Sequence, residues 1–245
     1  MNKLVRMIKG SPVSLRFWPL RGELRIVGMP DASYKNNEDK SSQRALCIFL
    51  AEQRRHDHVD TRGSLIDYES HKITQATMST TVAELYALMK CFGNSLFLKG
   101  LWADCSGQPV AIHMRTDANN LVTTARTTHQ PEQKETIHLI QMLRKESNSG
   151  AIDDLAHVVS ADCLSDSLTK HSAKADALIK SVETGVLKGV DSHPPFRSLL
   201  KHKAFLAVWL CNNITVSRPS EITCFMREEI NQEILIAVCN NSTPY

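Results

Sequence analysis

Four carboxylates stand beside small or polar residues where the chain is expected to begin or end a helix or strand. They are Asp31 in "PDASY", Glu84 in "TVAELY", Asp117 in "TDANN" and Asp166 in "LSDSL". If they converge in one cleft, they repel one another unless divalent cations lie between them. Carboxylate oxygens are hard ligands, which select Mg²⁺ or Mn²⁺. The pattern therefore raises the hypothesis of a metal site.

Each of these acids also has a simpler interpretation. The helix dipole favours Asp and Glu at helix N-termini, which accounts for Glu84 and Asp166. Asp is common in turns at strand ends, which accounts for Asp31 and Asp117. The types and spacing of the four residues leave both interpretations open.

The first elements that must position these acids are three apolar segments joined by polar turns. Residues 23–29 ("ELRIVGM"), 45–52 ("ALCIFLAE") and 64–70 ("SLIDYES") indicate an antiparallel meander. The strongest helix signal follows at residues 78–102. There the hydroxyl of Ser79 can cap the helix, and apolar residues recur at helical spacing.

The second half of this pattern alternates strands and helices. Strands are predicted at 110–117 and 153–161, and helices at 118–128, 131–146 and 166–185. Three antiparallel strands followed by such an alternation predict an α/β fold, in which helices pack against a mixed sheet.

Composition limits the classes of protein that the chain can belong to. A length of 245 residues suits one domain with appendages, and a formal charge of +3 is compatible with nucleic acid as a partner. The seven cysteines include no C-x-x-C pair, which argues against a zinc knuckle or a disulfide framework. No signal peptide is recognised, and the apolar stretch 204–211 is too short to span a bilayer. We expect a cytoplasmic or nuclear protein with no membrane contact.

Four segments carry the acids in a recognisable order: "VGMPDASY", "MSTTVAELYAL", "MRTDANNLV" and "HVVSADCLSDSLTK". Together they resemble the ribonuclease H domain of copia-type retrotransposon polyproteins, and each looks like the family segment that holds one of its four acids. The resemblance covers roughly residues 1–203. Its first part, "NKLVRMIKGSPVSLRF", is similar to the connection between reverse transcriptase and nuclease.

The sequence departs from this family in the segment that leads to the fourth acid. His157 stands where Trp is frequent, and Ala161, Asp162 and Cys163 stand where Gly and Asn are frequent. Asp162 is an alternative fourth ligand, but the motif "SDSLTK" favours Asp166. Some ribonucleases H use a mobile histidine near this acid. Because His157 lies in a predicted strand, the sequence favours packing over proton transfer for it.

The resemblance implies an RNase H-like fold with a mixed five-stranded sheet, three antiparallel strands followed by two parallel ones, and flanking helices. It also implies a division of the chain into three parts. Residues 1–23 would be a basic linker from the reverse transcriptase connection. Residues 24–185 would be the RNase H-like domain, and residues 186–245 a weakly structured tail.

The implied activity is cleavage of the RNA strand of RNA–DNA hybrids with two Mg²⁺ or Mn²⁺ ions as cofactors. Asp31, Glu84, Asp117 and Asp166 would be the catalytic residues and metal ligands, with Asp31 as the central ligand. The implied partners are the hybrid and the reverse transcriptase domain of the same or parent polyprotein. Residues beside the acids and on the nearby helices are candidate substrate contacts: Ser33, Asn119, Asn120, Arg126 and Lys134.

Two other functions are compatible with the sequence. The chain could be a catalytically silent relic, or a fragment of a reverse transcriptase that binds hybrid or acts as a scaffold. It could also be a transposase or integrase on the same fold, although such enzymes usually need three acids in another arrangement.

Overall fold

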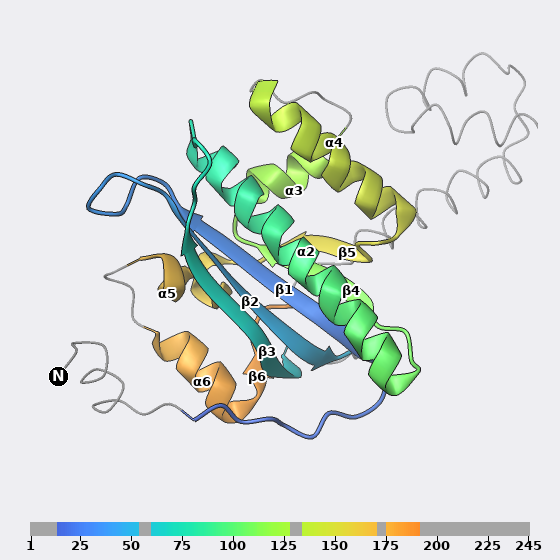
Figure 1. Cartoon of the computed structure of the whole chain (residues 1–245). Coiled ribbons are helices and arrows are strands. Elements are labelled where there is room, and N and C mark those ends of the chain that lie inside the picture. Colours follow the sequence, from blue (N-terminus) through green and yellow to red (C-terminus); the bar gives the residue numbers. More distant parts are fainter. Residues whose placement is uncertain (1–13, 54–59, 128–133, 171–174, 192–245) are drawn as a thin grey trace, which may run out of the picture. The chain divides into compact units, whose positions relative to one another are not determined.

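In the described residues, six strands form one mixed sheet in the order β5-β4-β1-β2-β3-β6 (Figure 1). The computed structural model describes residues 14–53, 60–127, 134–170 and 175–191, all within the unit Met1–His193. The strands are β1 (Leu24–Ser33), β2 (Gln43–Glu52), β3 (Thr61–Lys72), β4 (Ala111–Thr116), β5 (Asp154–His157) and β6 (Val186–Leu187).

The strand directions confirm the predicted mixed sheet. β1 is antiparallel to β2, and β2 is antiparallel to β3. β4 is parallel to β1, and β5 is parallel to β4. The two-residue strand β6 is an addition to the five predicted strands, and it pairs antiparallel with the start of β3.

The two faces of the sheet follow from the alternation of side chains along its strands. Ile26 of β1 and Ile48 of β2 belong to the core on one face, and their neighbours Val27 and Phe49 belong to the core on the other. The helices α2 (Thr80–Ser106), α3 (Asn119–Arg126) and α4 (Lys134–Ser149) cover the first face. The helices α5 (Asp166–Thr169) and α6 (Asp176–Thr184) cover the second (Figure 1).

The long helix α2 begins and ends at capping residues. At its start, the Ser79 hydroxyl accepts a hydrogen bond from the Val82 amide at 3.3 Å. It runs past the predicted end at residue 102 to Ser106, because Gly107 provides a left-handed C-cap whose amide donates to the Ala103 carbonyl. The caps fix the ends of α2, and apolar residues such as Leu85 and Leu88 pack the helix, and with it Glu84, against the sheet.

The predicted helix 166–185 is divided in two. Helix α5 stops after one turn because Lys170 has an extended backbone, and α6 begins at Asp176. The hydroxyl of Thr169, the last residue of α5, donates to Asp31 of β1. The break therefore places the end of α5 against the sheet.

Trp18 and Gly185 fit together beside the second face of the sheet. The Trp18 indole N–H donates to the Val182 carbonyl of α6 at 3.1 Å, and its amide donates to Ser64 of β3. Gly185 ends α6 with a φ of +70°, and a Cβ added there would lie 2.5 Å from the Trp18 ring. The Trp18 ring therefore leaves no room for a side chain at residue 185.

We expect Gly185→Ala to destabilise the protein more than Gly107→Ala. Both glycines are left-handed C-caps, so each substitution costs about 1–2 kcal/mol of backbone strain. At Gly107 no atom lies within 4 Å of the added methyl, whereas at Gly185 displacing Trp18 adds about 1–3 kcal/mol. Urea unfolding of both variants measures the difference. Equal costs would mean that Trp18 is free to move aside.

A network of buried charges lies between β1, β4, β5 and the residues after β6. Arg25, with no exposed surface, donates to both carboxylate oxygens of Asp191 at 2.8 and 2.5 Å. Arg115 pairs with Asp154 at 2.7 Å. His113 lies between the two guanidiniums, and burial together with these charges lowers its pKa to about 3, so the ring is neutral. Two cations therefore face two anions.

Residues outside the predicted domain boundaries, 24 and 185, also pack against the domain. Trp18 precedes the first limit and Asp191 follows the second, and both contact the sheet or its helices. Most of the predicted tail lies outside the described residues, and the three-part division stays a prediction. In the part that is described, no helix has the combination of length and hydropathy needed to cross a membrane.

Candidate metal centre

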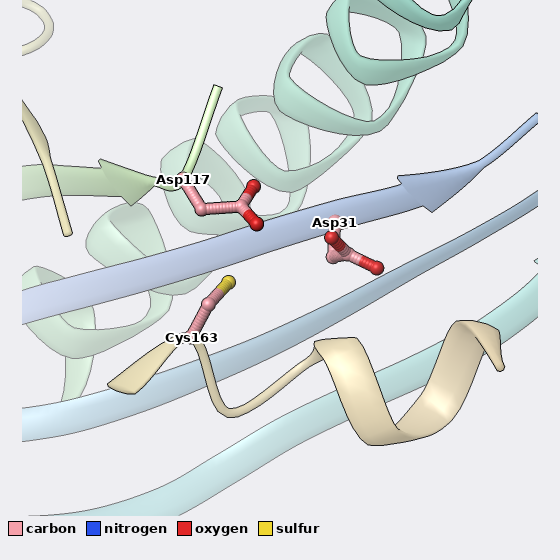
Figure 2. A group of neighbouring side chains, drawn as sticks. All are labelled: Asp31, Asp117 and Cys163. Carbon is pink, nitrogen blue, oxygen red and sulfur yellow. The ribbon is translucent and has the colours of Figure 1, made fainter. Parts of the chain in front are cut away.

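Asp31 and Asp117 are brought together by the parallel pairing of β1 and β4. The last pair of this ladder is Gly28 with Met114, and each acid follows three residues later: Asp31 within β1 and Asp117 directly after β4. Because the carboxyl ends of parallel strands meet at one edge of the sheet, the two carboxylates lie side by side (Figure 2). Asp31 is 2% exposed, whereas Asp117 is half-buried.

The thiol of Cys163 completes a group of three potential ligand atoms. Its Sγ, one carboxylate oxygen of Asp31 and one of Asp117 all lie within 4.8 Å of one another (Figure 2). Cys163 follows the short helix η1 (Ser160–Asp162) and is buried; its Sγ lies 3.7 Å from the Pro30 carbonyl. Burial raises the pKa of this thiol far above its usual range.

Glu84 reaches the same region from α2. It is 7% exposed and accepts a hydrogen bond from the amide of Ala32, the residue after Asp31. Its Oε2 atom is buried and has no hydrogen-bond partner among the described residues. Burial and the charges of Asp31 and Asp117 raise the pKa of Glu84 to about 9. A buried carboxylate oxygen without a donor is a position where a cation would be favourable.

Asp31 has one hydroxyl donor and several negative neighbours. The Thr169 hydroxyl of α5 donates to it, and the Ser33 hydroxyl donates to the Thr169 carbonyl at 2.9 Å. Burial raises the pKa of Asp31 to about 6. The Thr169 hydrogen bond opposes this shift, and the charges of Asp117 and Asp166 add to it.

Asp166 stands at the start of α5 and pairs with Lys170 four residues later. This hydrogen bond raises the pKa of Lys170, and the negative charges of Asp31 and Asp117 raise it further. Since the Asp166 charge raises the pKa of Asp31 in turn, the fourth acid lies close enough to act on the same cluster. The Lys170 ammonium supplies positive charge at its edge.

The alternative ligand Asp162 faces another part of the molecule. Its carboxylate lies against Gly189, where a Cβ would come within 2.5 Å of it. It also lines a cavity of about 450 Å³ with Leu164 and Lys180. His157 ends β5, where it pairs with Thr116, so it lies in a strand as its sequence context predicted.

The structure thus brings Asp31 and Asp117 together, and the charges of Glu84 and Asp166 act on the same region. It also adds three residues that the sequence did not single out as site residues. These are Cys163, Thr169 and Lys170. Thr169 and Lys170 stand in the segment "SDSLTK", which already served to select Asp166. Cys163 was noted as a departure from the family pattern. Its position beside two carboxylates required the fold.

The candidate substrate contacts differ in how available they are. Ser33 is buried and donates to Thr169. Asn119 and Asn120 are exposed at the start of α3, and Asn120 donates to Thr81 of α2. Arg126 is exposed, although one of its nitrogens donates to the Leu155 carbonyl. The last candidate, Lys134, opens α4, and its side chain lies outside the described residues.

These side chains fit a divalent cation. Two carboxylates and a thiol converge, and a fourth acid acts on them electrostatically. A third carboxylate has a buried oxygen that no donor among the described residues reaches. Among the described residues, Lys170 brings positive charge close to Asp31 and Glu84, and its own first partner is Asp166. The cluster therefore has more negative than positive charge, which a metal ion would balance.

The strand order and directions define the class of fold. A central β1 with an antiparallel meander on one side, two parallel strands on the other and helices on both faces is an RNase H-like fold. Asp31 and Asp117 lie toward the carboxyl ends of the parallel strands β1 and β4, where ligand sites of α/β sheets commonly lie.

Comparisons with solved structures also find RNase H domains. LC11-RNase H1 in complex with an RNA/DNA hybrid is 14% identical, with a TM-score of 0.43 over 63% of this chain and 99% of that one. The N-terminal RNase H domain of a Mycobacterium tuberculosis protein is 13% identical, with a TM-score of 0.42 over 66% and 97%. The RNase H domain of prototype foamy virus is 14% identical, with a TM-score of 0.38 over 67% and 95%. No family model and no curated protein matches the sequence.

Proposed function

We propose that the protein is a divalent-metal-dependent endonuclease that cleaves the RNA strand of RNA–DNA hybrids. The observation that carries this proposal is the cluster of Asp31 and Asp117 at adjacent parallel strand ends, near a buried carboxylate oxygen of Glu84 that has no partner among the residues the structure describes. The order of the four acid motifs supports an origin in a copia-type retrotransposon polyprotein. Its partner would be the reverse transcriptase domain, in the cytoplasm or nucleus.

Each acid has a role that its position supports. Asp31, central and least exposed of the strand acids, would be the shared ligand of two Mg²⁺ or Mn²⁺ ions, and Asp117, Glu84 and Asp166 would complete their coordination. When bound, such ions lower the pKa of an attacking water and stabilise the leaving oxygen. The Thr169 hydroxyl orients the Asp31 carboxylate, because it donates to Oδ2.

Substrate contacts would lie around this cluster. Asn119 and Asn120 are exposed one turn or less from Asp117, and their amides can donate to or accept from a ribose 2′-hydroxyl. Ser33 is the nearest hydroxyl along β1, but it is buried and would need to leave Thr169 to reach a substrate. Arg126 and Lys134 would contribute positive charge toward the phosphates.

The test is a cleavage assay with the full chain on three labelled substrates: RNA–DNA hybrid, duplex DNA and duplex RNA. We expect Mg²⁺-dependent cleavage of the RNA strand of the hybrid, leaving a 5′ phosphate and a 3′ hydroxyl, and none in chelator. Binding of the hybrid without cleavage in Mg²⁺ or Mn²⁺ would favour the catalytically silent alternative. Cleavage of duplex DNA in preference to hybrid would favour a transposase or integrase.

A further inference from the structure

The sulfur in this cluster suggests a second class of cation. We propose that Cys163, Asp31 and Asp117 form a mixed sulfur–oxygen site that binds a thiophilic divalent cation, Zn²⁺ or Cd²⁺, and that this cation blocks the nuclease. The three ligand atoms lie within 4.8 Å of one another and come from three separate elements (Figure 2). The inference rests on the proposed function, since the blocked site is the one assigned to the catalytic ions.

Glu84 supplies independent support for a cation here. The residue is 7% exposed, and its Oε2 atom is buried and has no hydrogen-bond partner in the part of the chain that is described. The amide of Ala32 holds the carboxylate next to Asp31. An ionised oxygen in that position is strongly unfavourable unless a cation is close.

The ligand set distinguishes between cations. Mg²⁺ takes oxygen ligands in octahedral geometry and gains nothing from a thiol. Zn²⁺ binds Cys sulfur and carboxylate oxygen, commonly with three protein ligands and one open position. Zn²⁺ also lies above Mn²⁺ in the general affinity order for divalent metals. On binding, the sulfur–metal bond forms and the thiol proton leaves to solvent.

Blocking follows from the sharing of ligands. The thiophilic cation would bind Asp31 and Asp117 on the side where Cys163 lies. The same two carboxylates would then be unable to coordinate the two catalytic ions. Cys163 is buried, and its Sγ also lies 3.5 Å from the Ser165 hydroxyl. The sulfur atom is therefore already positioned near the two carboxylates in the fold, so metal binding does not require the Cys163 side chain to move in from the surface.

The experiment titrates Cd²⁺ into the full-length protein and follows the ultraviolet charge-transfer band of cadmium–thiolate bonds. The matched variants are Cys163→Ser and Cys105→Ser, the latter changing an exposed cysteine on α2. We expect Cys163→Ser to remove the tightest component of the band and to weaken Cd²⁺ binding by about a hundredfold, the upper end of losses seen for outer-sphere partners. Cys105→Ser should leave that component in place.

Two further readouts separate this inference from the proposed function. The change in melting temperature on adding Mg²⁺ measures Mg²⁺ binding to the carboxylates. Inhibition of hybrid cleavage by Zn²⁺ measures whether the thiophilic cation blocks the nuclease. A normal Mg²⁺ shift with an unchanged Cd²⁺ band in Cys163→Ser would overturn the inference and leave the proposed function standing. A Cd²⁺ band that depends on Cys163, in a protein that cleaves no hybrid, would confirm the sulfur ligand and overturn the proposed function. Equal Zn²⁺ inhibition of wild type and Cys163→Ser would overturn the blocking.

Discussion

Asp31→Asn is expected to abolish Mg²⁺-dependent cleavage of hybrid and, in the same protein, to raise the melting temperature measured without metal. The substitution removes the central metal ligand. A catalytic ion stabilises the transition state by several kcal/mol, so losing it lowers the cleavage rate by about a thousandfold or more. The substitution also removes one of several carboxylates that repel in a buried cluster, a gain on the order of 1 kcal/mol. Asn keeps an oxygen to accept the Thr169 hydroxyl.

Asp162→Asn is the matched control, because it makes the same change of charge on a carboxylate that faces Gly189. It should keep both the cleavage rate and the Mg²⁺-induced thermal shift. Mg²⁺ should stabilise the wild type by mass action and Asp31→Asn much less. If Asp31→Asn melts lower than the wild type in chelator and responds to Mg²⁺ as the wild type does, Asp31 is a structural hydrogen-bond acceptor and not a metal ligand.

The same experiment has a pH dependence whose sign follows from the pKa of each acid. In the folded, metal-free protein the pKa values of Asp31 and Glu84 are raised to about 6 and about 9. At these two residues the folded state therefore binds more protons than the unfolded state between about pH 4 and pH 9, so their contribution to the free energy of unfolding falls as pH rises through this range. We expect the stabilisation of Asp31→Asn over the wild type to be small near pH 4 and larger at about pH 8.

The sequence was sufficient to predict the mixed sheet because its strands depend on local signals, whereas the role of the four acids as metal ligands stays a prediction. Nearly continuous apolar runs define β1 and β2, whose residues are mostly buried. The register of β1 with β4 then brings Asp31 beside Asp117 with no further information. A parallel pair needs only that both strands run to the same edge of the sheet.

The remaining features depend on contacts between residues far apart in sequence. Nothing near Cys163 indicates that its sulfur lies beside carboxylates 46 and 132 positions earlier, because that proximity requires the completed sheet. The break after Thr169 accompanies a hydrogen bond from Thr169 to Asp31, 138 residues earlier, which no local helix pattern contains. In the sequence, Arg25 is only a polar residue in an apolar strand. Its partner Asp191 lies 166 residues later, so the sequence gives no sign of their pairing.

The buried pair of Arg25 and Asp191 leads to the largest expected effect on stability. Asp191→Ala leaves two buried guanidiniums, Arg25 and Arg115, facing the single carboxylate of Asp154. Breaking a buried pair by removing one partner typically costs about 3–5 kcal/mol, because the remaining charge is desolvated without compensation. Although burial opposes it, the Arg25 guanidinium lowers the pKa of Asp191, so the carboxylate is ionised at neutral pH. Urea unfolding of the full chain measures the loss.

Asp104→Ala, at an exposed position on α2, is the control and should change stability by less than about 0.5 kcal/mol. A chain that ends at Gly185 loses β6 together with Asp191 and should be destabilised at least as much as Asp191→Ala. A chain that ends at Lys203 keeps both and should match the wild type. If Asp191→Ala costs no more than Asp104→Ala, water reaches Arg25, and the segment after β6 is not a part of the folded domain.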